Sequence, residues 1–444
     1  MYELHLLFGL SLWLCLIAIF LRSSCASIFH PITFYLAFHG VVFVIRPFFQ
    51  HFLELDSVYR LYGFWPNDEV KHITLLVVNL GLLCFFSSAM LTGNTAIRFW
   101  EHGAIRSRYR QGERLLLALL LASPLILLSI RYALSVNFGT EDLRKLARDA
   151  ATFHTVYTDT SAYLVDSNLM LGAFGVAIAW AYRFRFIALL PFLSFVTLRL
   201  TVGWSRYTFV MTSMGLALLY LFDHRRKWIE KWMVLAGFVL LLVFSALSSQ
   251  RALIADWIKG EQSKDAQFNQ EKKHFFDSLD FANLEFVEYL VHVVPERTGT
   301  YSYFSDTLEI LTAPIPRVLW PEKPVGPPIK LFNINEYGFP VGITYTLIGE
   351  GWQSLGYFGV IIWCTFAGAF MGRFYSWFVR HNASTFVTLY YCLCVPVSLQ
   401  WFRDGLLLSL VKFPLFFVAP IAMTQLLSHL NWPRRKLVHR TNVC

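Results

Sequence analysis

The chain has 444 residues, of which 56% are hydrophobic and only 15% are charged, and its formal net charge at pH 7 is +9. Soluble globular proteins carry about a quarter charged residues, so this composition, with a mean hydropathy of +0.49, excludes an ordinary soluble domain. The basic residues are spread over turns between hydrophobic segments rather than gathered with stacking aromatic residues, which excludes a nucleic-acid-binding surface.

Hydropathy predicts about eleven membrane spans (10–13), because a bilayer is crossed by roughly 20 apolar residues in a helix. In chain order the expected spans are 5–21, 31–49, 72–92, 115–134, 161–182, 186–202, 207–222, 232–249, 345–372, 384–402 and 406–427. The expected fold class is an all-α polytopic membrane protein with one large hydrophilic loop.

The basic residues also predict an orientation. They cluster in the linker 93–114, in the linker after residue 222 and in the C-terminal tail. These segments all fall on one side of the expected spans, which the positive-inside rule assigns to the cytoplasm. We therefore expect the N-terminus outside and the C-terminus in the cytoplasm.

The chain divides into three parts on this interpretation. Residues 1–249 hold the first eight spans, residues 250–344 form a large outer loop with short helices and a proline-rich segment, and residues 345–444 hold the last three spans and a basic cytoplasmic tail. The loop contains nine lysines and arginines against thirteen aspartates and glutamates. Because the loop is net acidic, any anion site in it must come from individual arginines.

Four arginines lie close to the expected outer membrane boundary: Arg206, Arg251, Arg317 and Arg403. An arginine beside a span is costly unless it pairs or faces a wet cavity. The planar guanidinium group binds phosphate oxygens in a bidentate way, so several arginines at one depth favour a shared anion. The alternative for each is that it snorkels to lipid headgroups or pairs with a nearby carboxylate.

The segment Asn283–Val294 is predicted to be an amphipathic helix within the loop. Glu285, Glu288 and His292 recur at helical spacing on its polar side. We expect this stripe to be a solvated face, and the alternative is a metal site or a general base.

A proline-rich run follows this helix. Six prolines between residues 314 and 328 prevent a helix and predict an ordered extended segment. Trp320 in this run and the nearby tyrosines either stack on sugar rings or anchor the segment at the membrane interface. Glu350, Asp280 and Asp404 are acids near the expected boundary, where a carboxylate is expensive to leave unpaired.

These motifs together resemble the bacterial O-antigen polymerases, the Wzy-type oligosaccharide repeat-unit polymerases. The similarity covers residues 280–360 tightly and most of the remaining chain loosely. The matching residues are Pro316-Arg317-x-x-Trp320-Pro321-x-Lys323-Pro324, Gly349-Glu350 with Gly356 and Gly359, Asp280-Phe281, Gly299-Thr300-Tyr301, Ser205-Arg206 and Arg403-Asp404-Gly405.

The resemblance implies an enzyme of the bacterial inner membrane with a glycosyltransferase-C-like helical fold and an active face in the periplasm. Its donor and acceptor would be oligosaccharides linked to undecaprenyl pyrophosphate, with membrane lipid and a chain-length-regulator protein as further partners and no cofactor or metal. Developing charge on the leaving pyrophosphate would be stabilised by arginines, and a carboxylate would act as general base.

The resemblance implies a role for each candidate residue. The pyrophosphate-binding residues are expected to be Arg206, Arg317, Arg403 and Arg251, the catalytic residues Glu350 and Asp280, and the sugar-binding residues Trp320, Tyr301 and Tyr345.

Two other functions remain as alternatives. An O-antigen ligase uses the same donor, but the ligases place a histidine about eleven residues before the Gly-x-x-Gly pair, where this chain has Tyr345. A lipid-linked oligosaccharide flippase would be expected to show repeated halves and charges at the bilayer midplane, and this sequence shows no internal repeat.

Overall fold

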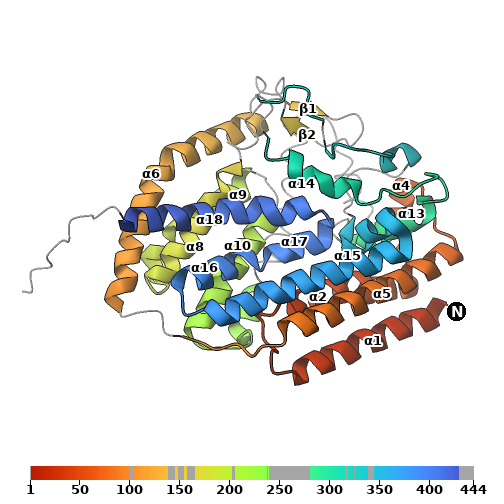
Figure 1. Ribbon diagram of the computed structural model, residues 1–444, viewed down its shortest axis with the longest axis horizontal. Coiled ribbons are helices and arrows are strands. Elements are labelled where there is room, and N and C mark those ends of the chain that lie inside the picture. The colour runs from red at the N-terminus through yellow and green to blue at the C-terminus, as the bar shows by residue number, and fades with distance from the viewer. Residues whose placement is uncertain are drawn as a thin grey trace, which may run out of the picture.

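The computed structural model describes residues 2–100, 105–138, 146–148, 155–157, 166–202, 206–237, 239, 281–315, 319–324, 326–338 and 345–429. Over these residues the chain is predominantly helical, and its long helices pack side by side in one bundle (Figure 1).

The N-terminal half contributes most of the bundle. Its elements are α1 Tyr2–Arg22, α2 Pro31–His39, the π-helix η1 Gly40–Ile45, α3 Arg46–Phe52, α4 Ser57–Tyr62, α5 Asp68–Gly93, α6 Ile105–Phe138, α8 Leu169–Ala181, the 3₁₀-helix η3 Phe186–Leu189, α9 Leu190–Val202 and α10 Arg206–Asp223. Two short strands, β1 Leu146–Arg148 and β2 Thr155–Tyr157, pair antiparallel.

The C-terminal half adds the segments that carry the candidate site. They are α13 Asn283–Val293, the 3₁₀-helix η6 Ser305–Leu308, α14 Glu309–Thr312, the 3₁₀-helix η7 Ile334–Tyr337, α15 Thr346–His381, α16 Thr385–Cys394, α17 Val397–Asp404 and α18 Leu407–His429.

The structure confirms a predominantly helical, membrane-embedded character, with β1 and β2 as the two strands in the described residues. Seven helices in the described ranges are long and apolar enough to cross a membrane, and they coincide with seven of the expected spans. Three shorter apolar helices, Leu169–Ala181, Phe186–Leu198 and Thr208–Asp223, fall on three more. The expected span 232–249 lies mainly outside the described residues, so the total of eleven stays a prediction.

Local sequence sets the beginning of these helices. The Asn67 side chain accepts a hydrogen bond of 2.8 Å from the Val70 backbone N–H, and Asp68 and Glu69 follow in the first turn of α5. This cap and the two acids complement the positive end of the helix dipole. Pro31, at the first position of α2, has the φ angle that a helix start needs.

Helices α5 and α15 run in the same direction in close contact (Figure 1). Gly368 of α15 packs on the Phe85 carbonyl of α5, and one turn later Gly372 packs on the Ala89 carbonyl. A Cβ atom on Gly372 would lie 2.7 Å from that carbonyl oxygen. Small residues allow this close approach, which is how helices pack in a membrane where burial in lipid gives little driving force.

The start of α15 folds back on the rest of the helix. Helical geometry breaks at Leu355–Gly356, where Gly356 has φ 60° and ψ −136°, a conformation that glycine adopts without strain. The backbone of Gly351 then packs against Val360, where a Cβ atom on Gly351 would lie 2.7 Å from the Val360 Cα.

A second contact supports this geometry. Gly81 of α5 faces both Ile348, before the break, and Cys364, after it. The expected span 345–372 is therefore a short helix, 346–354, folded against a long one. This places Glu350 inside the protein rather than at the mouth of a span.

Aromatic side chains fill the centre of the bundle. Tyr35 stacks on Phe85 with ring centroids 3.8 Å apart, and Phe378 stacks on Tyr391 at 4.0 Å. The Tyr391 hydroxyl donates a 2.6 Å hydrogen bond to the Phe29 carbonyl. These contacts join α2, α5, α15 and α16 into one core that holds the site helices in place.

Candidate functional site

The candidate site lies where four segments distant in sequence meet. The short helix at the start of α15 packs against α13, the segment 299–306 and the end of α17. Two backbone hydrogen bonds fix the segment 299–306 on α15: Ser302 N–H to the Gln353 carbonyl at 2.9 Å, and Tyr303 N–H to the Ser354 carbonyl at 3.1 Å.

Glu350 lies at the centre of this meeting point. Its exposed fraction is 0%, and neither carboxylate oxygen has a hydrogen-bond partner among the described residues. Burying a charged carboxylate without a hydrogen-bond donor or a cation costs roughly several kcal/mol of folding free energy. The Glu350 carboxyl group therefore has unused hydrogen-bonding capacity for a bound ligand.

A second carboxyl group, Asp306, lies near Glu350. Gln353 donates a 2.6 Å hydrogen bond from Nε2 to the Asp306 carboxylate. Burial raises the pKa of Asp306, although Lys330 and the hydrogen bond from Gln353 oppose the rise. Burial thus favours the protonated form of Asp306, which makes it a second carboxyl group in the site.

Arg403 and Gly405 form the wall contributed by α17. Gly405 ends this helix with φ 76°, and a Cβ atom on it would lie 3.1 Å from the Glu350 Cβ. The Trp363 indole N–H donates to the Gly405 carbonyl at 3.4 Å, and Asn283 donates to the Arg403 carbonyl at 3.5 Å. The turn after α17 is therefore held from two sides against Glu350.

The Arg403 side chain itself is half-buried and makes no ion pair within the described ranges. Its buried Nε likewise lacks a hydrogen-bond partner there. A buried guanidinium nitrogen without an acceptor is costly, so Arg403 has unused capacity to bind an anion.

The three candidate sugar-binding aromatic residues lie at different places. Tyr301 is half-buried, and its hydroxyl approaches Gly356 at the turn of α15. Tyr345, also half-buried, packs edge-on against Phe286 at 5.0 Å. Trp320 lies in the proline-rich run, whose Lys323 ammonium group donates to the Ala313 and Ile315 carbonyls. Tyr301 and Tyr345 are both near Glu350 in the fold, whereas Trp320 is half-buried in the proline-rich run.

The remaining candidates lie outside the described residues. These are Arg251, Asp280 and Arg317, together with the side chain of Arg206, whose backbone begins α10. Their roles stay predictions. The described residues contain no group of three or more His, Cys, Asp or Glu side chains placed to hold a metal ion.

One expectation about the loop helix is wrong. Glu285 and Glu288 were expected on a solvated face of α13, yet their exposed fractions are 0% and 1%. Glu285 accepts a bidentate ion pair from Arg46, which is also fully buried, and Glu288 accepts a hydrogen bond from the Tyr59 hydroxyl. The polar side of α13 is buried because α3 and α4 supply partners for it.

This polar cluster contains a carboxyl group with an unusual pKa. The pKa of Glu288 is raised to about 8, because burial and the neighbouring Glu285 carboxylate raise it more than Tyr59, Lys71 and Arg46 lower it. Glu288 is therefore protonated at neutral pH in the folded protein.

Sequence reasoning missed Asp306, Gln353 and Arg46. Gln353 follows Glu350 by three residues, which places the two on one helix face, and this spacing was the available signal. Arg46 lies within the expected span 31–49, and an arginine in a span indicates a buried partner. Asp306 gave no signal, since its contact with Gln353 depends on the folded loop.

The geometry thus defines a predominantly helical, membrane-embedded protein with a buried acidic site at the start of α15. Comparison with family models, curated proteins and solved structures found no match to this chain.

Proposed function

We propose that this protein is a polymerase of undecaprenyl-pyrophosphate-linked oligosaccharide repeat units, of the O-antigen or a related surface polysaccharide. It would transfer the growing glycan as a block from its lipid carrier onto a new lipid-linked repeat. The motif resemblance supplies the reaction class, and the environment of Glu350 supports it.

Glu350 carries the proposal. Its carboxylate is fully buried and has no hydrogen-bond partner in the described part of the chain, and it lies beside Arg403-Asp404-Gly405. An acceptor sugar hydroxyl donating to this carboxylate satisfies its oxygens and loses its proton to it in the transfer step.

The remaining bond changes move negative charge onto the pyrophosphate leaving group. The acceptor oxygen forms a bond to the anomeric carbon of the donor while the bond from that carbon to the lipid pyrophosphate breaks, and the electron pair leaves with the pyrophosphate. Arg403, with Arg206, Arg317 and Arg251, would stabilise the developing negative charge through guanidinium hydrogen bonds. Because arginines provide this charge, we expect the reaction to proceed without an added divalent metal ion.

We also propose a membrane topology for this chain. Eleven spans in a glycosyltransferase-C-like arrangement, with the N-terminus outside and the C-terminus in the cytoplasm, place the start of α15 and the segment 281–338 at the periplasmic face of the inner membrane. The donor and acceptor are delivered on that face, and a chain-length-regulator protein is the expected protein partner.

The direct test is reconstitution. Purified protein in liposomes, given lipid-linked repeat units, is expected to produce a ladder of glycans in the presence of EDTA and without ATP. Transport of the substrate without a ladder would support the flippase instead, and transfer to a lipopolysaccharide core would support the ligase. Arg317→Lys keeps the charge but loses the planar fork, so polymer length or yield should fall.

A further inference from the structure

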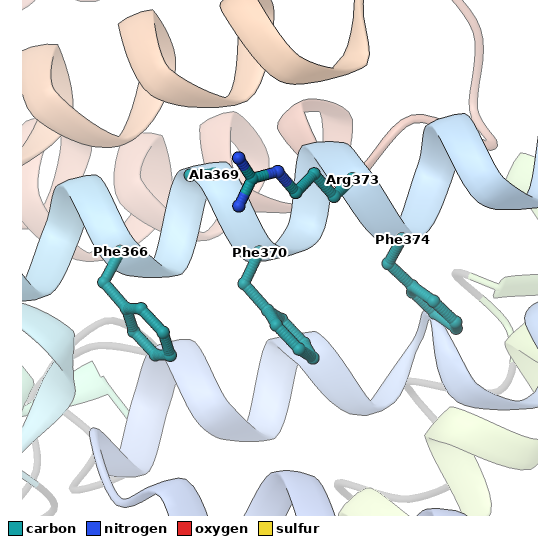
Figure 2. Close-up of a pocket in the computed structure, with 5 residues that line it drawn as sticks. All are labelled: Phe366, Ala369, Phe370, Arg373 and Phe374. Carbon is teal, nitrogen blue, oxygen red and sulfur yellow. The ribbon is translucent and has the colours of Figure 1, made fainter.

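An apolar groove runs along α15, C-terminal to the candidate site on this helix. Its lining residues are Phe366, Ala369, Phe370, Arg373 and Phe374, and its volume is about 380 Å³. Figure 2 shows the three phenylalanine rings projecting from one side of the helix, with the Arg373 side chain lying along the helix towards Ala369. This volume is at the lower end of the roughly 300–1,000 Å³ of small-molecule sites.

The walls of the groove are fixed by neighbouring aromatic residues. Phe370 packs edge-on against Trp401 of α17 at 6.1 Å, and Phe374 packs against Tyr391 of α16 at 4.8 Å. Phe366 and Phe370 nevertheless remain 44% and 43% exposed. The groove is therefore a preformed feature with an open apolar side.

The position of the groove along the helix indicates what covers it. Arg373 follows Gly372, which packs against Gly93 at the end of α5, so Arg373 lies beside the end of the membrane-spanning helix α5. Phe366 lies seven residues earlier, about 10 Å further into the apolar zone. The groove thus leads from the membrane boundary towards the bilayer interior, and lipid chains are what surround a helix there.

Arg373 gives the groove a polar end. The side chain is exposed, and within the described ranges it forms no ion pair. It lies over Ala369 rather than away from the apolar surface (Figure 2). A guanidinium group so placed is costly unless an anion meets it, and a phosphate group is a good geometric match.

We propose that this groove binds one anionic phospholipid, with its phosphate on Arg373 and one acyl chain along Phe370 and Phe366. The phenyl rings provide contact area for the chain, and the small side chain of Ala369 leaves room for the Arg373 side chain to lie along the helix (Figure 2). An anionic headgroup adds an attraction of about 1 kcal/mol for a basic residue at the surface, which corresponds to about a fivefold preference over a zwitterionic lipid.

The test is native mass spectrometry of the purified protein in detergent, titrated with phosphatidylglycerol and phosphatidylcholine of the same acyl chains. The wild-type protein is expected to retain phosphatidylglycerol about fivefold more strongly. Arg373→Gln should remove this preference, and Arg373→Lys, which keeps the charge, should retain most of it.

Two further variants separate the headgroup from the chain. Phe370→Ala should weaken retention of both lipids and leave their ratio unchanged. Arg380→Gln is the matched control, because Arg380 is an exposed arginine on the same helix outside the groove, and it should leave the preference intact. Equal retention of the two lipids by the wild-type protein, or the same loss in Arg380→Gln as in Arg373→Gln, would overturn the proposal.

Discussion

Arg46 and Glu285 form a fully buried ion pair between residues 239 positions apart in the chain. The pair joins the end of the second apolar segment to α13, and α13 in turn contacts α15: the Trp352 indole N–H donates to the Val294 carbonyl at 3.0 Å, and Leu290 packs on Gly349. The pair therefore holds the helix that forms one wall of the candidate site.

Removing one partner of this pair should be strongly destabilising. Arg46→Ala leaves the Glu285 carboxylate buried without its cation, at a cost of about 3–5 kcal/mol. We expect the apparent Tm in detergent to fall by several degrees. The double variant Arg46→Met with Glu285→Met should regain much of the loss, since an apolar pair leaves no uncompensated charge; a double variant as unstable as Arg46→Ala would contradict this explanation.

Glu288 should make the stability of the protein depend on pH. Its folded-state pKa of about 8 exceeds the ordinary value of 4.5, so the folded state holds more protons between these values. The stability that Glu288 contributes is fully present below about 4.5 and is lost as the pH rises through about 8.

The measurement compares the apparent Tm of the wild-type protein and of Glu288→Gln between pH values of about 4.5 and about 8. Since glutamine does not titrate, the wild-type Tm should fall relative to the variant as the pH rises. The exposed Glu296 provides the control Glu296→Gln, which should follow the wild-type profile. A constant difference between wild type and Glu288→Gln at every pH would count against the raised pKa.

Glu350→Gln should abolish polymer formation while the protein still folds. Glutamine keeps the shape but accepts no proton, and loss of a general base lowers rates by roughly 10²–10⁴-fold. The rate is measured from the glycan ladder at equal protein, with Glu296→Gln as the matched control. Wild-type rates in Glu350→Gln would exclude this residue as the base and leave Asp306 as the carboxyl to test next.

Arg403→Lys should lower turnover although it keeps the positive charge. Lysine cannot make the two parallel hydrogen bonds that guanidinium makes to a pyrophosphate, and we expect a loss on the order of tenfold or more in rate. Arg60→Lys is the control, because Arg60 is exposed and pairs only with Asp56 among the described residues. Equal activity of the two variants would remove Arg403 from the pyrophosphate site.

Gly359→Ala should destabilise the fold of α15. A Cβ atom on Gly359 would overlap the Gly351 carbonyl oxygen, so the fold-back of the short helix must open, at a cost of about 1–3 kcal/mol or more. Gly237→Ala is the matched control, since a Cβ atom there meets nothing within 4 Å, and alanine favours a helix by up to about 1 kcal/mol. A Tm for Gly359→Ala equal to that of Gly237→Ala would contradict the fold-back.

Hydropathy located the membrane helices well. Ten of the eleven expected segments coincide with apolar helices, because the cost of placing polar groups in lipid acts on each segment separately. The same local reasoning named Glu350, a carboxylate at the start of an expected span, as a candidate before its burial was known.

Local reasoning failed where partners come from distant segments. It placed Glu285 and Glu288 in solvent because an acidic stripe on an isolated helix is normally solvated, and Arg46 and Tyr59 lie more than 220 residues away. It also gave no sign of the turn at Leu355–Gly356 inside the expected span 345–372, because hydropathy is averaged along a segment.

The sequence alone determined that this chain is a helical membrane protein and which segments are apolar enough to cross a bilayer, because transfer into lipid depends on the composition of each segment. Only the tertiary structure decided that Glu350 is enclosed by α17 and the segment 299–306, and that Arg46 meets Glu285. The physical reason is that burial and ion pairing depend on which surfaces come together, and hydropathy along the chain carries no information on that pairing.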